Sequence, residues 1–93
     1  MRVLIIETVI NLPWCMSLKD KRKIRRGLID RLQLRYRVSA KEIDCQDVWK
    51  TLCLGIAAVV ISETGGRELE ASIHETVLEN CNGEIREWNV DLI

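Results

Sequence analysis

The sequence of 93 residues predicts an α+β domain with the element order βαββαβ. Three observations predict this order. Two apolar runs, 3–10 and 52–61, are rich in β-branched residues and are typical of strands buried on both faces. Two longer segments, 18–36 and 69–81, repeat apolar residues at helical spacing. Two further segments, 38–46 and the residues after Gly83, are more polar and extended in character, which is typical of edge strands.

The first strand is expected over Val3–Ile10 and ends before Pro13, which cannot donate a ladder hydrogen bond. Ser17 is the expected N-cap of the first helix, and Asp20 follows it at capping-box spacing. The helix is expected from about Leu18 to Tyr36. Its apolar stripe consists of Leu18, Ile24, Leu28, Ile29, Leu32 and Tyr36.

An edge strand is expected from Val38 to about Gln46, and a short connection over 47–50 leads to the third strand, Leu52–Ile61. Gly65-Gly66 is expected to break the chain before the second helix. The stripe of that helix is Leu69, Ile73, Val77 and Cys81, and Asn82-Gly83 is a stop signal. The last strand is expected to place Trp88, Val90 and Leu92 on one face.

This order is the split βαβ, or ferredoxin-like, pattern: a single domain, 1–93, with a four-stranded antiparallel sheet and two helices on one face. The first and third strands are then central. The other sheet face is bare, and both central strands still supply apolar residues to it. Side-chain alternation divides the first strand into Val3, Ile5 and Val9 on one side and Leu4, Ile6 and Ile10 on the other. In the third strand, the two sides are Cys53, Ala57, Val59 and Ile61 against Leu52, Leu54, Ile56 and Val60. Such an apolar patch favours a homo-oligomer formed through the open sheet face. Alternatively, long Lys, Arg and Trp side chains of the edge strands cover it.

The four cysteines, Cys15, Cys45, Cys53 and Cys81, form no C-x-x-C motif, and there is a single histidine. We therefore expect no metal site, no cofactor and free, mostly packed thiols in a cytoplasmic protein. Glu7 interrupts the short apolar run at the start of the chain, so no signal peptide is expected. No segment is long enough to span a bilayer, so no membrane partner is expected.

Charge is divided unevenly along the chain. Residues 1–50 contain twelve Lys and Arg against six Asp and Glu, whereas residues 51–93 contain two against eight. Most of the cations lie in the first helix. Four of them are expected to face outward near its N-terminus, where free N–H groups also favour anions: Lys19, Arg22, Lys23 and Arg26. These four are the candidate nucleic-acid or anion-binding residues.

Lys21 and Arg25 fall inside the apolar sector of the same helix. They are expected to reach past the sheet or to pair with acids beneath them, for which Asp44, Asp47 and Glu7 are candidates. A different explanation of the basic helix stays open. The acidic second helix packs beside it in this fold, so the two charges could simply complement each other.

Three segments together resemble the bacterial YlxP-like family, a family of unknown function: S-L-K-D-K-R at 17–22, E-I-D-x-Q-D-x-W at 42–49, and Leu54-Gly55. The resemblance covers nearly the whole chain and implies a ferredoxin-like fold. Genes of that family tend to lie among translation genes, which implies RNA or the ribosome as a partner. Cys45 stands where many members have histidine.

The resemblance also marks a polar edge, with Lys21 and Arg25 as supporting cations: Asp44, Gln46, Asp47 and Trp49. These residues could bind a partner. A structural role is favoured over binding, with Asp47 capping a turn, Asp44 pairing with Lys21 or Arg25, and Trp49 packing.

The leading functional prediction is a non-catalytic protein that binds structured RNA through phosphate contacts along the first helix. The alternative is a dimeric protein-interaction module without nucleic-acid binding. An enzyme is not expected, because no nucleophile–base pair or phosphate-binding Gly-rich loop is visible and His74 is the only histidine.

Overall fold

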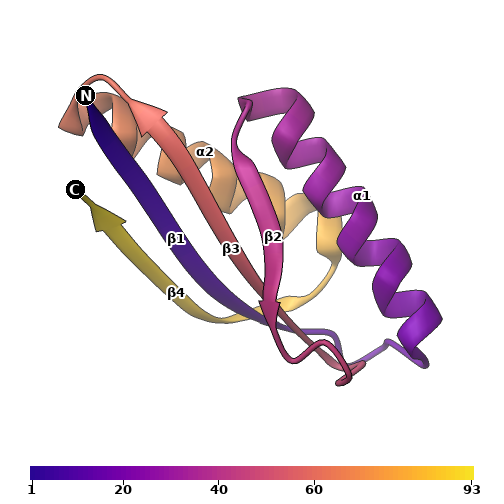
Figure 1. The fold of residues 1–93 in the computed structure, drawn as a ribbon. Helices are drawn as coiled ribbons and strands as arrows, with labels where there is room; N and C mark the ends of the chain where they lie inside the picture. Colours follow the sequence, from indigo (N-terminus) through magenta and orange to yellow (C-terminus); the bar gives the residue numbers. More distant parts are fainter.

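In the computed structural model, which describes residues 1–93, six elements follow in the predicted order. They are β1 (Arg2–Asn11), α1 (Leu18–Tyr36), β2 (Ser39–Asp44), β3 (Thr51–Val60), α2 (Glu63–Cys81) and β4 (Glu84–Leu92). The strands form one antiparallel sheet in the order β2-β3-β1-β4, and both helices cover the same face of it (Figure 1). The ferredoxin-like prediction, with β1 and β3 central, is confirmed.

Helix α1 begins and ends where the sequence predicts. The Ser17 hydroxyl accepts a hydrogen bond from the Asp20 N–H at 3.1 Å. At the other end Arg37 is left-handed, with a φ of 55°, and its N–H donates to the Gln33 carbonyl. Leu28 and Leu32 are buried in the core beneath the helix. The helix therefore lies against the sheet through its apolar stripe and exposes its charged side.

The expectation that Gly65-Gly66 breaks the chain is wrong, because both glycines lie in the first turn of α2. The helix starts at its N-cap, Ser62, whose hydroxyl accepts from the Gly65 N–H. A Cβ on Gly66 would lie 2.9 Å from Leu92 Cδ1, so this glycine permits close packing of α2 on β4. Glycine is needed here for space and not for a turn.

Strand β2 is shorter than predicted and ends at Asp44. Cys45 has a φ of 56°, a left-handed conformation that stops the ladder, and the chain then turns through residues 45–50. The register between β2 and β3 also shifts between Glu42 and Asp44. This irregularity places Ile43 over Gly55, where a Cβ would lie 2.8 Å from Ile43 Cγ2.

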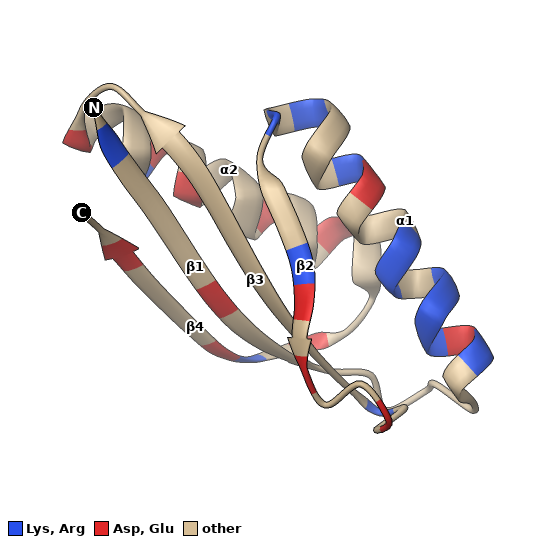
Figure 2. Ribbon diagram, viewed as in Figure 1, with Lys and Arg blue, Asp and Glu red and all other residues tan.

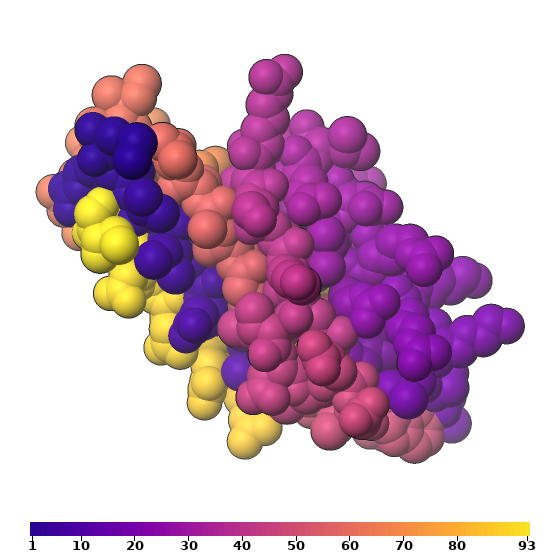
Figure 3. Space-filling model, in the orientation of Figure 1, coloured from indigo at the N-terminus to yellow at the C-terminus, as the bar shows by residue number.

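The sheet face away from the helices is open, as predicted. Leu4, Ile6 and Ile10 of β1 are in the core, whereas Val3, Ile5 and Val9 point to the other face and are partly exposed. Opposite Val3 lies Val59, which is 70% exposed. Figure 3 views the molecule from this side, where neither helix covers β1, β3 or β4.

Candidate functional site

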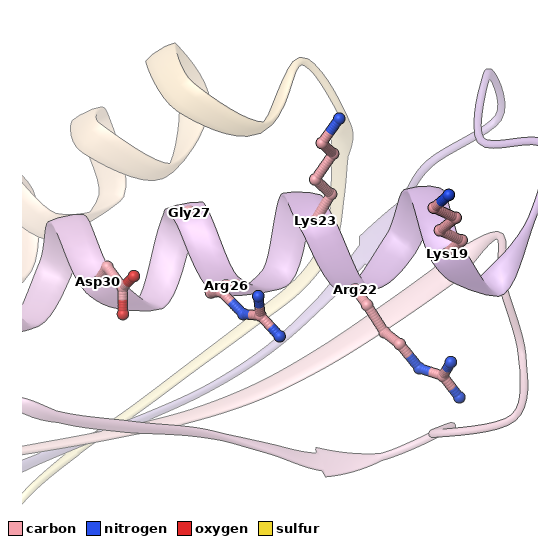
Figure 4. Close-up of a pocket in the computed structure, with 6 residues that line it drawn as sticks. All are labelled: Lys19, Arg22, Lys23, Arg26, Gly27 and Asp30. Carbon is pink, nitrogen blue, oxygen red and sulfur yellow. The ribbon is translucent and has the colours of Figure 1, made fainter.

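Four cations on the outward side of α1 form a surface that we call the basic face: Lys19, Arg22, Lys23 and Arg26. Each of them lies three residues from one of the others and four from another, so they follow one side of the helix. Together with Gly27 and Asp30 they line a shallow hollow (Figure 4). All four side chains are exposed, and none belongs to the four ion pairs of the chain. The predicted outward orientation is confirmed.

No carboxylate forms an ion pair with the basic face, although Asp30 lines the same hollow and Asp20 lies in the first turn of α1. Lys19 also lies in the first turn of α1, at the positive end of the helix dipole, where a cation costs about 0.3–1 kcal/mol. Figure 2 shows that Lys and Arg dominate the N-terminal half of α1. The acidic residue of its first turn is Asp20. The arrangement is unfavourable for the isolated chain and becomes favourable when an anion binds.

The acidic side chains of α2 form no ion pair with the cations of α1. The hydrogen bonds between the two helices come from the Tyr36 hydroxyl, which lies 2.5 Å from the Thr76 hydroxyl and 3.1 Å from the Ser72 carbonyl oxygen. The acidic side chains of α2 that form contacts form them elsewhere, for example between Glu63 and Arg67. Direct ion pairing between the helices therefore does not account for the basic face.

Lys21 points inward, as predicted, and its side chain is 1% exposed. Its ammonium group lies 2.8 Å from Glu42 Oε2 and donates to the carbonyl oxygens of Cys45 at 2.5 Å and Val48 at 2.6 Å. The ammonium group thus donates hydrogen bonds to two carbonyl oxygens, and its charge is paired with Glu42, whose Oε2 receives no hydrogen bond of suitable geometry. This one side chain joins α1 to the end of β2 and to the following loop.

The acid that pairs with Lys21 and Arg25 was predicted incorrectly. It is Glu42, and not Asp44, Asp47 or Glu7. Arg25 Nη1 lies 2.8 Å from Glu42 Oε1, so the carboxylate bridges the two cations. Burial alone would raise the pKa of Glu42, but the hydrogen bonds and charges of Lys21 and Arg25 outweigh it and lower the pKa.

A signal for Glu42 was present in the sequence. Strand β2 alternates, so Glu42 lies on the same face as Ala40 and opposite Leu54, both of which are buried. A carboxylate on the core side of a strand has to be paired. A polar edge strand is expected to expose its charged residues, as β2 does with Lys41 and Asp44, and Glu42 is the exception.

The predicted polar edge is only partly assembled. A second hollow lies between α1 and β2, and it brings together Arg22, Arg25, Gln46 and Asp47. Asp44 does not line it and instead accepts a hydrogen bond from the N–H of Cys45 at 2.8 Å.

Trp49 also lies outside this hollow. Its side chain is 39% exposed, and Lys50 Nζ lies 5.8 Å from its ring centroid. No side-chain hydrogen bond of Asp47 supports the turn, so the predicted capping role is absent. The two supporting cations of the polar edge, Lys21 and Arg25, thus pair with Glu42 in a structural cluster, and the other residues of the edge do not join it.

The remaining chemistry-bearing groups are dispersed. The four thiols are free, and three of them are buried. Desolvation by burial, reinforced by the neighbouring Cys45 thiol, raises the pKa of Cys53 to about 12. No three His, Cys, Asp or Glu side chains converge in the manner of a metal site. Neither helix combines the length and apolarity that a bilayer span requires.

The sequence matches a protein family and a curated relative. The sequence model of DUF503, described as a protein of unknown function, matches residues 3–90. The chain is also similar to the uncharacterized protein YlxP of Bacillus subtilis strain 168, with 44% identity over 43 residues. That alignment covers 46% of this chain and 47% of YlxP, so the chain spans about half the length of this curated relative.

Proposed function

The chain belongs to the DUF503 family, as its YlxP-like resemblance predicts, and we propose that it is a non-catalytic protein that binds structured RNA through the basic face. One observation supports this most directly: Lys19, Arg22, Lys23 and Arg26 are exposed, aligned and free of carboxylate partners. From Lys19 to Arg26 the helix rises about 10 Å, which allows contact with successive phosphates. RNA or the ribosome is the proposed partner.

The open sheet face lacks the residues that would bind RNA bases, which favours recognition of RNA through its phosphates. Proteins that read single-stranded RNA on a sheet stack bases on aromatic residues of the central strands. Here the open face of β1 and β3 presents Val3, Ile5, Val9, Ala57 and Val59, with no aromatic ring. Binding is thus expected to depend strongly on salt and weakly on sequence.

The salt dependence can be estimated. Four phosphate contacts predict a slope of about −2.8 to −3.6 in a plot of log K against log salt. Between 50 and 200 mM KCl the affinity should fall about 50- to 150-fold. The test is fluorescence anisotropy with a labelled RNA hairpin across this range.

The decisive variant is Lys19→Glu with Arg22→Glu. It should weaken binding strongly at 50 mM KCl and reduce the magnitude of the salt slope by about 2. A control outside α1 is Arg86→Glu, at an exposed cation of β4 that belongs to no ion pair. Equal affinity of the basic-face variant and the wild type would refute RNA binding by this face.

Two further features fit this proposal. The single histidine, His74, packs edge-on against Trp88 with ring centroids 4.6 Å apart, which favours a structural role over catalysis. Four free thiols and an RNA partner together favour a cytoplasmic location.

The open sheet face supports a second candidate, a homodimeric protein-interaction module. Val59 is 70% exposed and Ile61 is 94% exposed, and they adjoin the partly exposed Val3 and Ile5. A second copy would remove this apolar surface from water. Sedimentation should then show a dimer at micromolar concentration that Val59→Glu dissociates, whereas a wild-type monomer at all concentrations would exclude this module.

A further inference from the structure

Gly27 occupies a position in α1 that packing does not explain. It lies in the middle of a 19-residue helix and is exposed. A Cβ built on it meets nothing within 4 Å. Glycine destabilises a helix interior relative to alanine, so the chain loses stability here without any gain in packing.

The space left by Gly27 is where surface hollows meet. Gly27 lines the hollow of the basic face and another hollow along Arg31 and Arg35. It also lines a hollow between α1 and the end of α2, which we call the third hollow. Absence of a side chain at such a point allows another backbone to approach the helix closely. The cations Lys23 and Arg31 flank it in the third hollow.

The third hollow also contains an aromatic ring held in place. Trp14 lines it and is 43% exposed, and its indole N–H donates to the Asn82 carbonyl at the C-cap of α2, at 2.8 Å. Asn80 and Asn82 line the same hollow. Asn80 uses its amide N–H to bond the Thr76 carbonyl, which leaves its side-chain oxygen available as an acceptor.

We propose that the hollow between α1 and the end of α2 binds one unpaired nucleotide of a structured RNA. This inference rests on the proposed function and names the element of RNA that it recognises. The base stacks on Trp14, the adjoining phosphate passes over Gly27 between Lys23 and Arg31, and the two asparagines provide polar contacts to the base edge. The basic face then contacts the paired region beside it.

The test uses two labelled RNA hairpins that differ only by a single bulged nucleotide. Stacking of one base on an aromatic ring predicts that the wild type binds the bulged hairpin at least fivefold more tightly. Trp14→Leu should abolish this preference while retaining affinity for the paired hairpin, because Trp14 does not line the hollow of the basic face. Gly27→Leu should abolish the preference too. Trp49→Leu is the matched control, since Trp49 is also exposed but does not line the hollow, and it should retain the preference.

Stability separates an effect on binding from an effect on folding. Leucine is a better helix former than glycine, so Gly27→Leu should raise the Tm by several degrees or leave it unchanged. Loss of the bulge preference in such a stable variant supports the nucleotide site.

Equal binding of both hairpins by the wild type, or retention of the preference in Gly27→Leu and Trp14→Leu, would overturn the nucleotide site alone. Failure of the wild type to bind either hairpin at 50 mM KCl would refute the proposed function itself.

Discussion

Replacement of Lys21 by methionine tests the structural role of the buried cation of α1. The two side chains are similar in length, so the apolar stem still packs and only the ammonium group is lost. Glu42 Oε2 then loses its partner at 2.8 Å, and the carbonyl oxygens of Cys45 and Val48 lose their donor. The variant therefore isolates the buried charge and its hydrogen bonds.

Removal of one partner of a buried ion pair costs about 3–5 kcal/mol, because the remaining charge is left uncompensated. Arg25 still bonds the other oxygen of Glu42. We therefore expect Lys21→Met to lower the free energy of unfolding by about 3 kcal/mol, the lower end of that range. For a domain of this size the Tm should fall by about 12–24 °C.

Urea unfolding at pH 7, followed by tryptophan fluorescence and circular dichroism, measures this loss. Lys23→Met is the matched control, since Lys23 lies on the same helix but is exposed and unpaired. It should change stability by no more than about 0.5 kcal/mol. If Lys21→Met also costs less than about 1 kcal/mol at an unchanged m value, the cluster is not the stabilising contact that we infer.

Three further outcomes are expected. The pKa of Glu42 is lower in the folded chain than its ordinary value of 4.5, so its contribution to stability is present above pH 4.5 and is lost as pH falls through the folded pKa; acid unfolding of Glu42→Gln should lack this component. Gly83→Ala should destabilise the chain by about 1–3 kcal/mol, because its Cβ would lie 2.7 Å from the carbonyl oxygen of Asn11, and thermal unfolding measures the loss. Iodoacetamide at pH 8 should modify the half-buried Cys45 before Cys53, whose thiol is buried and has a pKa of about 12; mass spectrometry that finds Cys53 modified first would contradict the structure.

The sequence predicts the element order and most boundaries because those features depend on residues near one another in the chain. The limits of α1 follow from the Ser17 cap and a stripe repeated every three or four residues. The central position of β1 and β3 follows from their apolar character on both faces. The outward orientation of Lys19 and Arg22 follows from the helical period alone.

The errors arise where spatial contacts override local signals. Gly65-Gly66 reads as a break by composition, yet Gly66 meets Leu92, 26 positions further on in the numbering of the chain. The length of β2 was overestimated because the left-handed turn at Cys45 follows no strong sequence signal.

Only the tertiary structure decides which of the cations are structural and which are free to bind. The helical period separates Lys21 from Lys23, but the acid that pairs with Lys21 is chosen by the packing of α1 on β2, which brings Glu42 within 2.8 Å. The hollow between Trp14 and Gly27 likewise exists because the end of α2 lies beside α1. Composition and periodicity report what each segment contains, whereas ion pairs and hollows depend on distances between segments that are remote in the chain.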